Sequence, residues 1–201
     1  LPKWQEMYAL VKKITEEELR RHPRNTHTHY IYARLAQEMS AYFPEDKKLS
    51  EDQYRAALET SPKRQQLFYG LGRLYLMQGR MDEALNLYRQ VRDFDLDLGE
   101  GHWMLGVSLL YDKQDLQNGA KEIAESQRVP YRYRLREPRE FIPLGDAYQV
   151  LNDKEGMKKM VELLPHVPAD RNQIQAYVEW AISLNNMQLM TERDQVLAYA
   201  E

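Results

Sequence analysis

Of the residue types that commonly do chemistry in proteins, cysteine is missing from this 201-residue chain. The absence of cysteine removes disulfides, thiolate metal ligands and thiol nucleophiles. The sequence also contains no GxSxG elbow, no glycine-rich phosphate loop and no HExxH zinc motif. We therefore expect a protein that is not an enzyme and that uses no cofactor.

Three histidines, His22, His27 and His29, lie close together. His27 and His29 could offer two imidazoles to a metal ion, but no third histidine or carboxylate follows at helical spacing. We expect these side chains to mark a solvated helix start, and we predict no metal site.

The most unusual local feature is the segment 131–139, YRYRLREPR, in which aromatic and cationic residues alternate. Tyrosine offers a flat apolar face and arginine a planar fork of donors, so the segment could stack on sugars or bases and pair with phosphates or carboxylates. The alternative is a solvated loop whose tyrosines pack on the fold. We predict a second contact with a partner at Arg132, Tyr133, Arg134 and Arg136.

A repeated pattern surrounds these residues: Leu-Gly, followed three residues later by an aromatic or large apolar residue. The clearest copy comprises Phe68, Leu71, Gly72, Tyr75, Gly79, Ala84, Tyr88 and Val91. Matching small residues stand at Ala36, Gly72, Gly106, Gly145 and Ala181, so that successive copies are spaced by 36, 34, 39 and 36 residues. These motifs and the spacing of 34 resemble the tetratricopeptide-repeat (TPR) family.

The resemblance implies an all-α, TPR-like solenoid of antiparallel helix pairs, with about four to five repeats in a right-handed superhelix. The small residues are expected where one helix of a pair presses on the other. We predict a single domain, residues 1–201, with an incomplete repeat at 1–24 and repeats at 26–62, 63–98, 99–137, 138–169 and 170–201. The helices are expected at about 3–21, 26–43, 50–60, 62–78, 81–94, 99–111, 116–127, 139–151, 154–164, 170–186 and 190–200.

In TPR proteins one face of each first helix lines a concave groove. Projected from the small residues, this face holds Tyr30, Gln37, Tyr69, Arg73, Met77, Trp103, Tyr111, Arg139, Asp146, Asn185 and Asn186. We predict partner contacts at Tyr30, Tyr69, Arg73, Trp103, Tyr111 and Arg139, with the alternative that Trp103 belongs to the core. Tyr69 and Arg73 stand where carboxylate-gripping TPR domains have Lys and Asn, which argues against a chaperone C-terminus as the ligand.

Composition and charge limit the classes of partner that we expect. The net charge is −3, from 28 Lys+Arg and 31 Asp+Glu, which gives no reason to expect duplex nucleic acid. The uncharged stretch 103–111 has nine residues, about half of the ~18–20 that span a bilayer. We expect a non-catalytic scaffold for a protein, peptide or glycan partner. A structural spacer or oligomerisation element, and single-stranded nucleic-acid binding through the Arg-Tyr segment, are the alternatives.

A closer resemblance covers residues 50–111. The runs AALETSPKRQQ (56–66) and GHWMLG (101–106), together with Tyr75, are similar to the TPR tails of bacterial O-antigen ligase and polymerase-like membrane proteins. This resemblance implies a soluble periplasmic or extracytoplasmic arm, cut from a longer envelope polysaccharide protein and tethered to its membrane part. Without it, a cytoplasmic adaptor is expected. No catalytic residue carries over.

Overall fold

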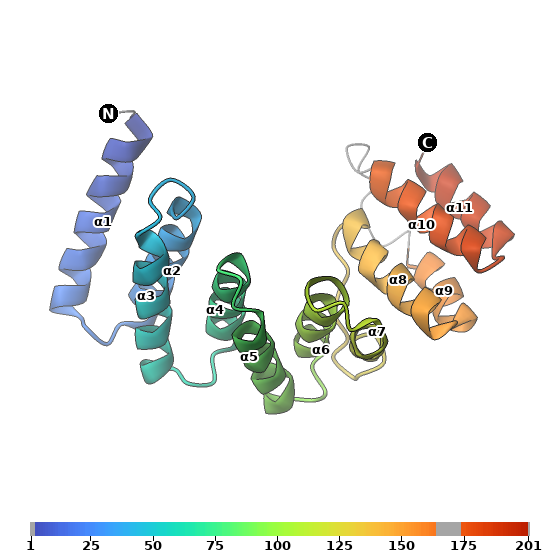
Figure 1. The fold of residues 1–201 in the computed structure, drawn as a ribbon, viewed down its shortest axis with the longest axis horizontal. Coiled ribbons are helices and arrows are strands. Elements are labelled where there is room, and N and C mark those ends of the chain that lie inside the picture. Colours follow the sequence, from blue (N-terminus) through green and yellow to red (C-terminus); the bar gives the residue numbers. More distant parts are fainter. Residues whose placement is uncertain (1–2, 164–173, 201) are drawn as a thin grey trace. The chain divides into compact units, whose positions relative to one another are not determined.

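The computed structural model describes residues 3–163 and 174–200, and within these ranges the chain is all-α, with eleven α-helices and no strand. Within each unit most successive helices are antiparallel neighbours joined by short turns, whereas residues 126–137 form a longer loop (Figure 1). The chain divides into two compact units, Leu1–Val91 and Arg92–Glu201, and each is described by itself. The predicted all-α, TPR-like fold class is confirmed; the predicted repeat boundaries stay a prediction, and the one at 169/170 lies outside the described residues.

Unit 1 holds five helices: α1 (Lys3–Arg21), α2 (Thr26–Met39), α3 (Asp46–Thr60), α4 (Gln65–Met77) and most of α5 (Met81–Phe94). Its core is rich in tyrosine, because Tyr32, Tyr54 and Tyr88 are each about 1% exposed. Each buried hydroxyl group needs a partner. Tyr54 donates to Gln37 Oε1 at 2.9 Å, and Tyr32 donates to Glu16 Oε1 at 2.8 Å.

Helix α1 is attached to α3 through the buried carboxylate of Asp46, which accepts hydrogen bonds from the Tyr8 hydroxyl and from Lys12 Nζ, the latter at 3.0 Å. The other side of α1 stays uncovered within the described residues, where Met7, Leu10 and Ile14 are exposed.

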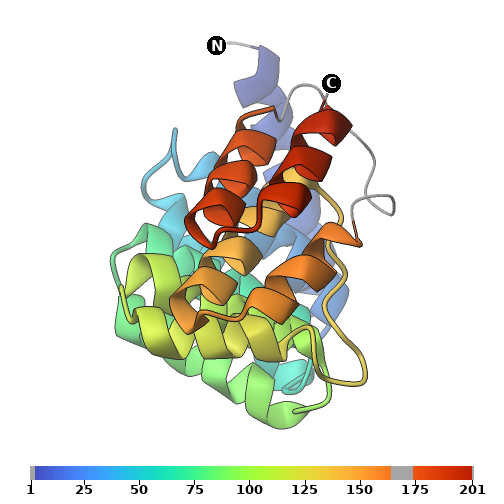
Figure 2. The ribbon, with the colours of Figure 1, turned by 90° about the vertical axis from the view of Figure 1, so that its right-hand side faces the viewer.

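Unit 2 contains α6 (Gly99–Val107), α7 (Leu116–Glu125), α8 (Phe141–Leu151), α9 (Lys154–Val161), α10 (Ile174–Asn186) and α11 (Met190–Ala200). A π-helical turn, η1 (Ser108–Asp112), extends α6, and a 3-10 turn, η2 (Pro138–Glu140), precedes α8. Figure 2 shows the pair α8/α9 beside the pair α10/α11. The core joins these pairs, because the rings of Phe141 in α8 and Trp180 in α10 stack 4.5 Å apart.

The three glycines predicted at helix–helix contacts differ in the space around them. A Cβ on Gly72 would enter the Tyr88 ring, and one on Gly106 would lie 2.8 Å from the backbone nitrogen of Ile123. The packing interpretation therefore holds at these two positions. At Gly145 it does not, because the nearest atom, Met160 Cε, is 3.6 Å from the Cβ position, an ordinary contact.

The predicted helices agree with the observed ones to within a few residues, with two local corrections. Helix α4 begins at Gln65, because residues 61–64 form a turn and Arg64 is the N-cap; the predicted start at residue 62 is wrong. The π-helical turn at 108–112 was not predicted. It lies where Gly119 of α7 approaches the backbone of Leu110 too closely to admit a Cβ.

Candidate partner-binding surfaces

In unit 1, the predicted groove residues Tyr30, Tyr69 and Arg73 lie at or near the surface. Tyr30 is half-buried, and the guanidinium carbons of Arg34 and Arg64 are 5.8 and 5.4 Å from its ring centroid. Such distances are typical of cation–π contacts. Tyr69 is also half-buried, whereas Arg73 is exposed. Arg73 is therefore the most accessible of the three.

Trp103 lies in the core of unit 2, with 5% of its surface exposed. Its ring stacks on Tyr133 with a centroid separation of 4.4 Å and an interplanar angle of 8°. The indole face that a partner would need is therefore covered by a residue of the same chain. Trp103 is thus a core residue, as the alternative interpretation of the sequence stated, and its stack on Tyr133 helps to hold the Arg-Tyr segment.

Tyr111 lies in η1 and donates a hydrogen bond of 2.6 Å to Asp146 Oδ2 in α8. Burial raises the pKa of Asp146, the hydrogen bond from Tyr111 lowers it, and the nearby Glu179 of α10 raises it further. Burial and the bond to Asp146 also raise the pKa of Tyr111. Two carboxylates thus lie close together beside a partly exposed tyrosine ring.

An apolar row on α10 was missed by the sequence reasoning. Ile174, Val178 and Ile182 are spaced by four residues, and their exposed fractions are 56%, 41% and 54%. The signal was available: Val178 and Ile182 stand three residues before and one after the small Ala181, as Tyr69 and Arg73 do around Gly72. We call these three side chains the α10 row.

The α10 row lies close to the carboxylate of Glu179, because Glu179 stands three residues before Ile182 and residues at this spacing are neighbours on a helix surface. Glu179 in turn acts on the pKa of Asp146 in α8. This side of unit 2 therefore combines exposed aliphatic side chains with negative charge.

The Arg-Tyr segment is held by its backbone. Tyr131 N donates to Asp97 O at 3.0 Å, Gly99 N donates to Tyr131 O at 2.8 Å, and Tyr133 N donates to Ser126 O at 2.8 Å. Position 99 must be glycine for this approach, because a Cβ there would overlap the backbone of residues 126 and 133. The segment is thus fixed against α6 and α7.

The side chain of Tyr133 is fixed as well. Its hydroxyl donates to Glu140 Oε1 at 2.7 Å, and Gln127 Nε2 donates to its carbonyl oxygen at 3.1 Å. Burial, the bond to Glu140 and nearby Glu100 raise the pKa of Tyr133, while Arg136 lowers it. Tyr133, one of the four residues predicted to make the second partner contact, therefore anchors the segment to the fold.

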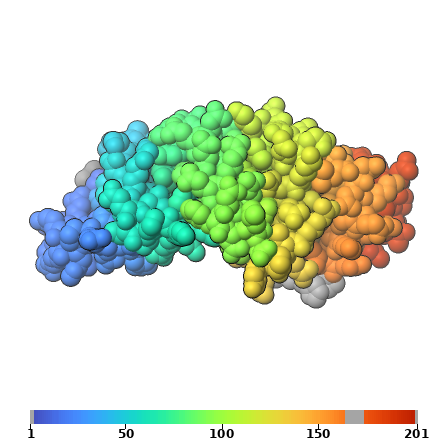
Figure 3. Space-filling view, turned by 90° about the horizontal axis from the view of Figure 1, so that it is seen from below, coloured from blue at the N-terminus to red at the C-terminus, as the bar shows by residue number. Residues whose placement is uncertain are grey.

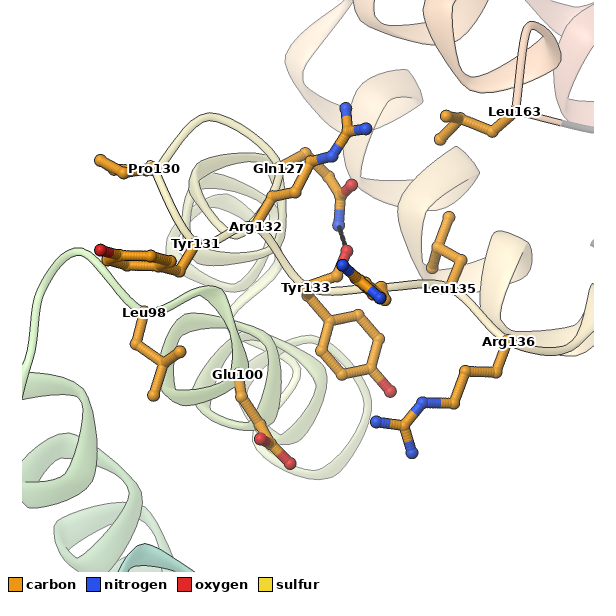
Figure 4. Close-up of a pocket in the computed structure, with 11 residues that line it drawn as sticks. Leu98, Glu100, Gln127, Pro130, Tyr131, Arg132, Tyr133, Leu135, Arg136 and Leu163 are labelled. Carbon is orange, nitrogen blue, oxygen red and sulfur yellow. Dashed lines mark hydrogen bonds between the residues drawn. The ribbon is translucent and has the colours of Figure 1, made fainter. Parts of the chain in front are cut away.

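The segment borders a cleft of about 620 Å³. Its lining comes from Leu98 just before α6, Glu100 in the first turn of α6, Gln127 after α7, the segment 130–136, and Leu163 after α9. Figure 3 shows the segment, in yellow, standing out from the surface, and Figure 4 shows Arg132 and Arg136 extending to opposite sides of it. Arg139, a predicted groove residue, is not part of this lining and pairs with Glu137 at 2.7 Å.

A buried ionic cluster lies where α6 meets α7. His102 Nδ1 is 2.7 Å from Glu122 Oε2, His102 Nε2 is 3.0 Å from Leu96 O, and Arg92 binds the other carboxylate oxygen. The bond to Glu122 raises the pKa of His102, and burial opposes this rise. Four residues before each of the other small residues the chain has a buried aromatic (Tyr32, Phe68, Phe141, Tyr177), so His102 replaces an aromatic core residue.

The expectation that His22, His27 and His29 mark a solvated helix start is wrong for His29, whose two ring nitrogens have partners within unit 1. His29 is buried, with Nδ1 2.7 Å from Gln53 Oε1 and Nε2 2.9 Å from Pro23 O. Among the residues that the structure describes, no group of three or more histidine, aspartate or glutamate side chains could hold a metal ion.

Comparison with known proteins relates part of the chain to a known repeat family. Residues 51–102 match the family model described as tetratricopeptide repeat. Two similar solved structures are MamA protein (16% identity, TM-score 0.54, covering 86% of this chain and 89% of that one) and YrrB, titled a TPR protein with an unusual peptide-binding site (12% identity, TM-score 0.56, covering 92% and 90%). No curated protein matches the sequence significantly.

Proposed function

We propose that this chain is a non-catalytic protein-interaction scaffold, and that unit 2 binds a peptide segment of a partner protein along the α10 row. The match of residues 51–102 to the tetratricopeptide-repeat model supports a role in binding proteins. A solved structure of similar fold is titled a TPR protein with a peptide-binding site, which supports a peptide as the ligand.

The observation that carries the proposal is the exposure of the α10 row. Three aliphatic side chains in line on one helix, each more than 40% exposed, form an apolar strip, and contiguous exposed apolar patches are typical of protein-interaction sites. Burial of a Val or Ile side chain is worth roughly 1.5–3 kcal/mol. The strip can therefore supply most of the free energy of a weak peptide complex.

The neighbouring charges define the peptide. Asp146 and Glu179 accept hydrogen bonds and repel carboxylates, while Tyr111 adds a partly exposed ring. We expect a ligand with two or three apolar residues at helical spacing and a lysine or arginine beside them, because a cation would face the two carboxylates.

A peptide library displayed on phage and selected on the immobilised chain tests this function. Val178→Glu and Ile182→Glu should abolish recovery of the selected peptides, while the helical circular dichroism signal persists because both side chains are exposed. Leu197→Glu on α11 is the matched control, since Leu197 is also 41% exposed. Peptides that bind all three variants as well as wild type would refute binding at the α10 row.

In unit 1, Tyr30, Tyr69 and Arg73 remain a proposed contact of the same kind. Arg73 is exposed and Tyr69 is half-buried one helical turn before it. Arg73→Gln tests the contribution of this surface, with Arg89→Gln of α5, another exposed arginine, as its control. A peptide selected on the full chain that binds both variants equally would remove unit 1 from the proposal.

A second candidate function, self-association as an oligomerisation element, is favoured by α1. Its exposed Met7, Leu10 and Ile14 form one row, flanked on the same side by Glu6 and Lys13. In an antiparallel pair of α1 helices centred near Leu10, Glu6 of each copy lies opposite Lys13 of the other copy. In a parallel pair, Glu6 would instead lie opposite Glu6 and Lys13 opposite Lys13, so like charges would repel.

Light scattering over a range of concentrations tests the second candidate. The measured mass should rise toward that of a dimer, and Leu10→Glu should return it to that of a monomer. The matched control is Leu116→Glu in unit 2, because the exposed fractions of the two leucines are similar, 51% for Leu116 and 57% for Leu10. A wild-type chain that stays monomeric at every concentration would exclude self-association through α1.

A narrower hypothesis concerns the larger protein. The similarity of residues 50–111 to O-antigen ligase tails is its sole support, and neither the family model nor the structural neighbours add to it. Under this hypothesis the chain is the tethered arm of an envelope polysaccharide protein and its partner carries a glycan. In the described residues no helix has the length and apolar character to cross a membrane. Several apolar segments of ~18 residues encoded upstream of Leu1 would support the hypothesis; a reading frame without them would oppose it.

A further inference from the structure

We infer that the cleft beside the Arg-Tyr segment is a separate binding site for an acidic peptide segment, whose carboxylates pair with Arg132, Arg134 and Arg136. The inference does not depend on the α10 row, because it rests on different residues and on the opposite charge. It explains why this loop carries three arginines, which the packing of the repeat does not require.

The charge of the cleft is unbalanced. Within residues 3–163 and 174–200, no ion pair or hydrogen bond engages the guanidinium groups of Arg132, Arg134 and Arg136, and all three side chains are exposed. The backbone N–H of Arg136 donates to the Glu140 carboxylate. Other arginines of the unit are paired: Arg92 with Glu122, and Arg128 with Asp153 at 2.8 Å. The cleft lining contains one carboxylate, Glu100, against the three arginines.

The backbone of the segment is ordered before any ligand arrives. Its bonds to residues 97, 99 and 126 and the stack of Tyr133 on Trp103 hold the chain, and Leu135 packs against the core. A ligand would then lose affinity mainly through ordering of the arginine side chains, not of the loop. Each guanidinium can bind a carboxylate with two parallel hydrogen bonds.

The aromatic residues argue against nucleic acid as the ligand. Single-stranded binding uses a series of aromatic faces on which successive bases stack. Here one face of Tyr133 is covered by Trp103 and its hydroxyl is bonded to Glu140, so the ring is part of the scaffold. In the cleft lining only Tyr131, which is 68% exposed, offers a free aromatic ring. One ring and three cations suit carboxylates better than bases.

Glu100 is the acidic residue of the cleft. Figure 4 shows that Glu100 points to the same side of the segment as Tyr133 and Arg136. Glu100 is also close enough to Tyr133 to raise the pKa of the tyrosine. A carboxylate bound at Arg136 would be repelled by Glu100. Removal of this charge should therefore strengthen binding, an outcome that a purely structural role of Glu100 would not produce.

The experiment measures fluorescence anisotropy of a fluorescein-labelled peptide of alternating Glu and Gly residues, with the same peptide containing Gln for Glu as the ligand control. The triple variant Arg132→Gln/Arg134→Gln/Arg136→Gln should raise Kd roughly tenfold or more, as expected for the loss of three exposed ion pairs. Glu100→Gln should lower Kd about two- to threefold at low salt.

A charge-matched triple variant, Arg20→Gln/Lys63→Gln/Arg89→Gln, removes three exposed cations from unit 1 and should leave Kd unchanged. Equal losses in both triple variants would overturn the inference, because net charge alone would then explain binding. A single-stranded oligonucleotide that competes for the cleft and is lost on Tyr131→Ala would also overturn it in favour of nucleic acid. Failure of the α10 variants in the phage selection would leave these measurements unaffected.

Discussion

The two glycines Gly106 and Gly145 stand at the same repeat position, yet we predict opposite effects when each is replaced by alanine. In a helix, alanine is favoured over glycine by about 0.5–1 kcal/mol. At Gly145 nothing opposes this gain, since the nearest atom to a new Cβ is 3.6 Å away. At Gly106 the Cβ would lie 2.8 Å from Ile123 N and 2.9 Å from Gly119 O, both backbone atoms that cannot rotate away.

Overpacking of this kind typically costs about 1–3 kcal/mol. We therefore expect Gly145→Ala to stabilise the chain by about 0.5–1 kcal/mol and Gly106→Ala to destabilise it by about 1–2 kcal/mol, after the helix-propensity gain is subtracted. Urea unfolding followed by circular dichroism measures both changes. A Gly106→Ala chain as stable as wild type would show that α6 and α7 have room to separate, and would refute the packing argument.

Three further predictions use the same unfolding assay. Trp103→Ala should cost about 3–5 kcal/mol as a core truncation, and a loss below about 1 kcal/mol would place the indole on the surface. The bond to Glu122 raises the pKa of His102 in the folded state, so the protonated imidazole stabilises the fold. This stabilisation is fully present below the unfolded-state pKa of about 6.5 and is lost as the pH rises through the folded-state pKa. The urea midpoint of wild type should thus fall more between about pH 6 and 8 than that of His102→Phe, and parallel curves would contradict this. Asp153→Ala should cost about 1 kcal/mol through loss of the α9 N-cap, whereas Arg128→Ala, which removes only its exposed ion pair, should cost less than about 0.5 kcal/mol.

The helices could be predicted from the sequence because the repeat places its signals in the core. Leu71, Gly72 and Tyr75 are all buried, and burial on one face imposes the 3.6-residue period that the pattern displays. The start of α4 could not be predicted, because Ser-Pro favours both a helix start and a turn. The choice between them depends on tertiary contacts, including the bond between Thr26 and Ser61 side chains at 3.1 Å.

The candidate surfaces were predictable only where side chains follow the repeat register. Tyr111 and Arg73 are accessible, as projected, but the same register also placed Trp103 on the groove face. Its burial results from the segment 131–136, which folds back against α6 and covers the indole with Tyr133. A contact between residues thirty positions apart produces no periodic pattern in the sequence. The sequence alone therefore could not decide whether Trp103 lies in the groove or in the core.

That contact also links the structural and the functional arguments. The loop between α7 and α8 is longer than a repeat turn, and its additional residues do two jobs: Tyr133 and Leu135 pack against the core, while Arg132, Arg134 and Arg136 stay in solvent. A loop that only connected the two helices would need the packing residues Tyr133 and Leu135 but not the three arginines. The arginines are therefore the part of the insertion that stability leaves unexplained, and Kd for an acidic peptide, rather than the unfolding midpoint, is the quantity that their substitution should change.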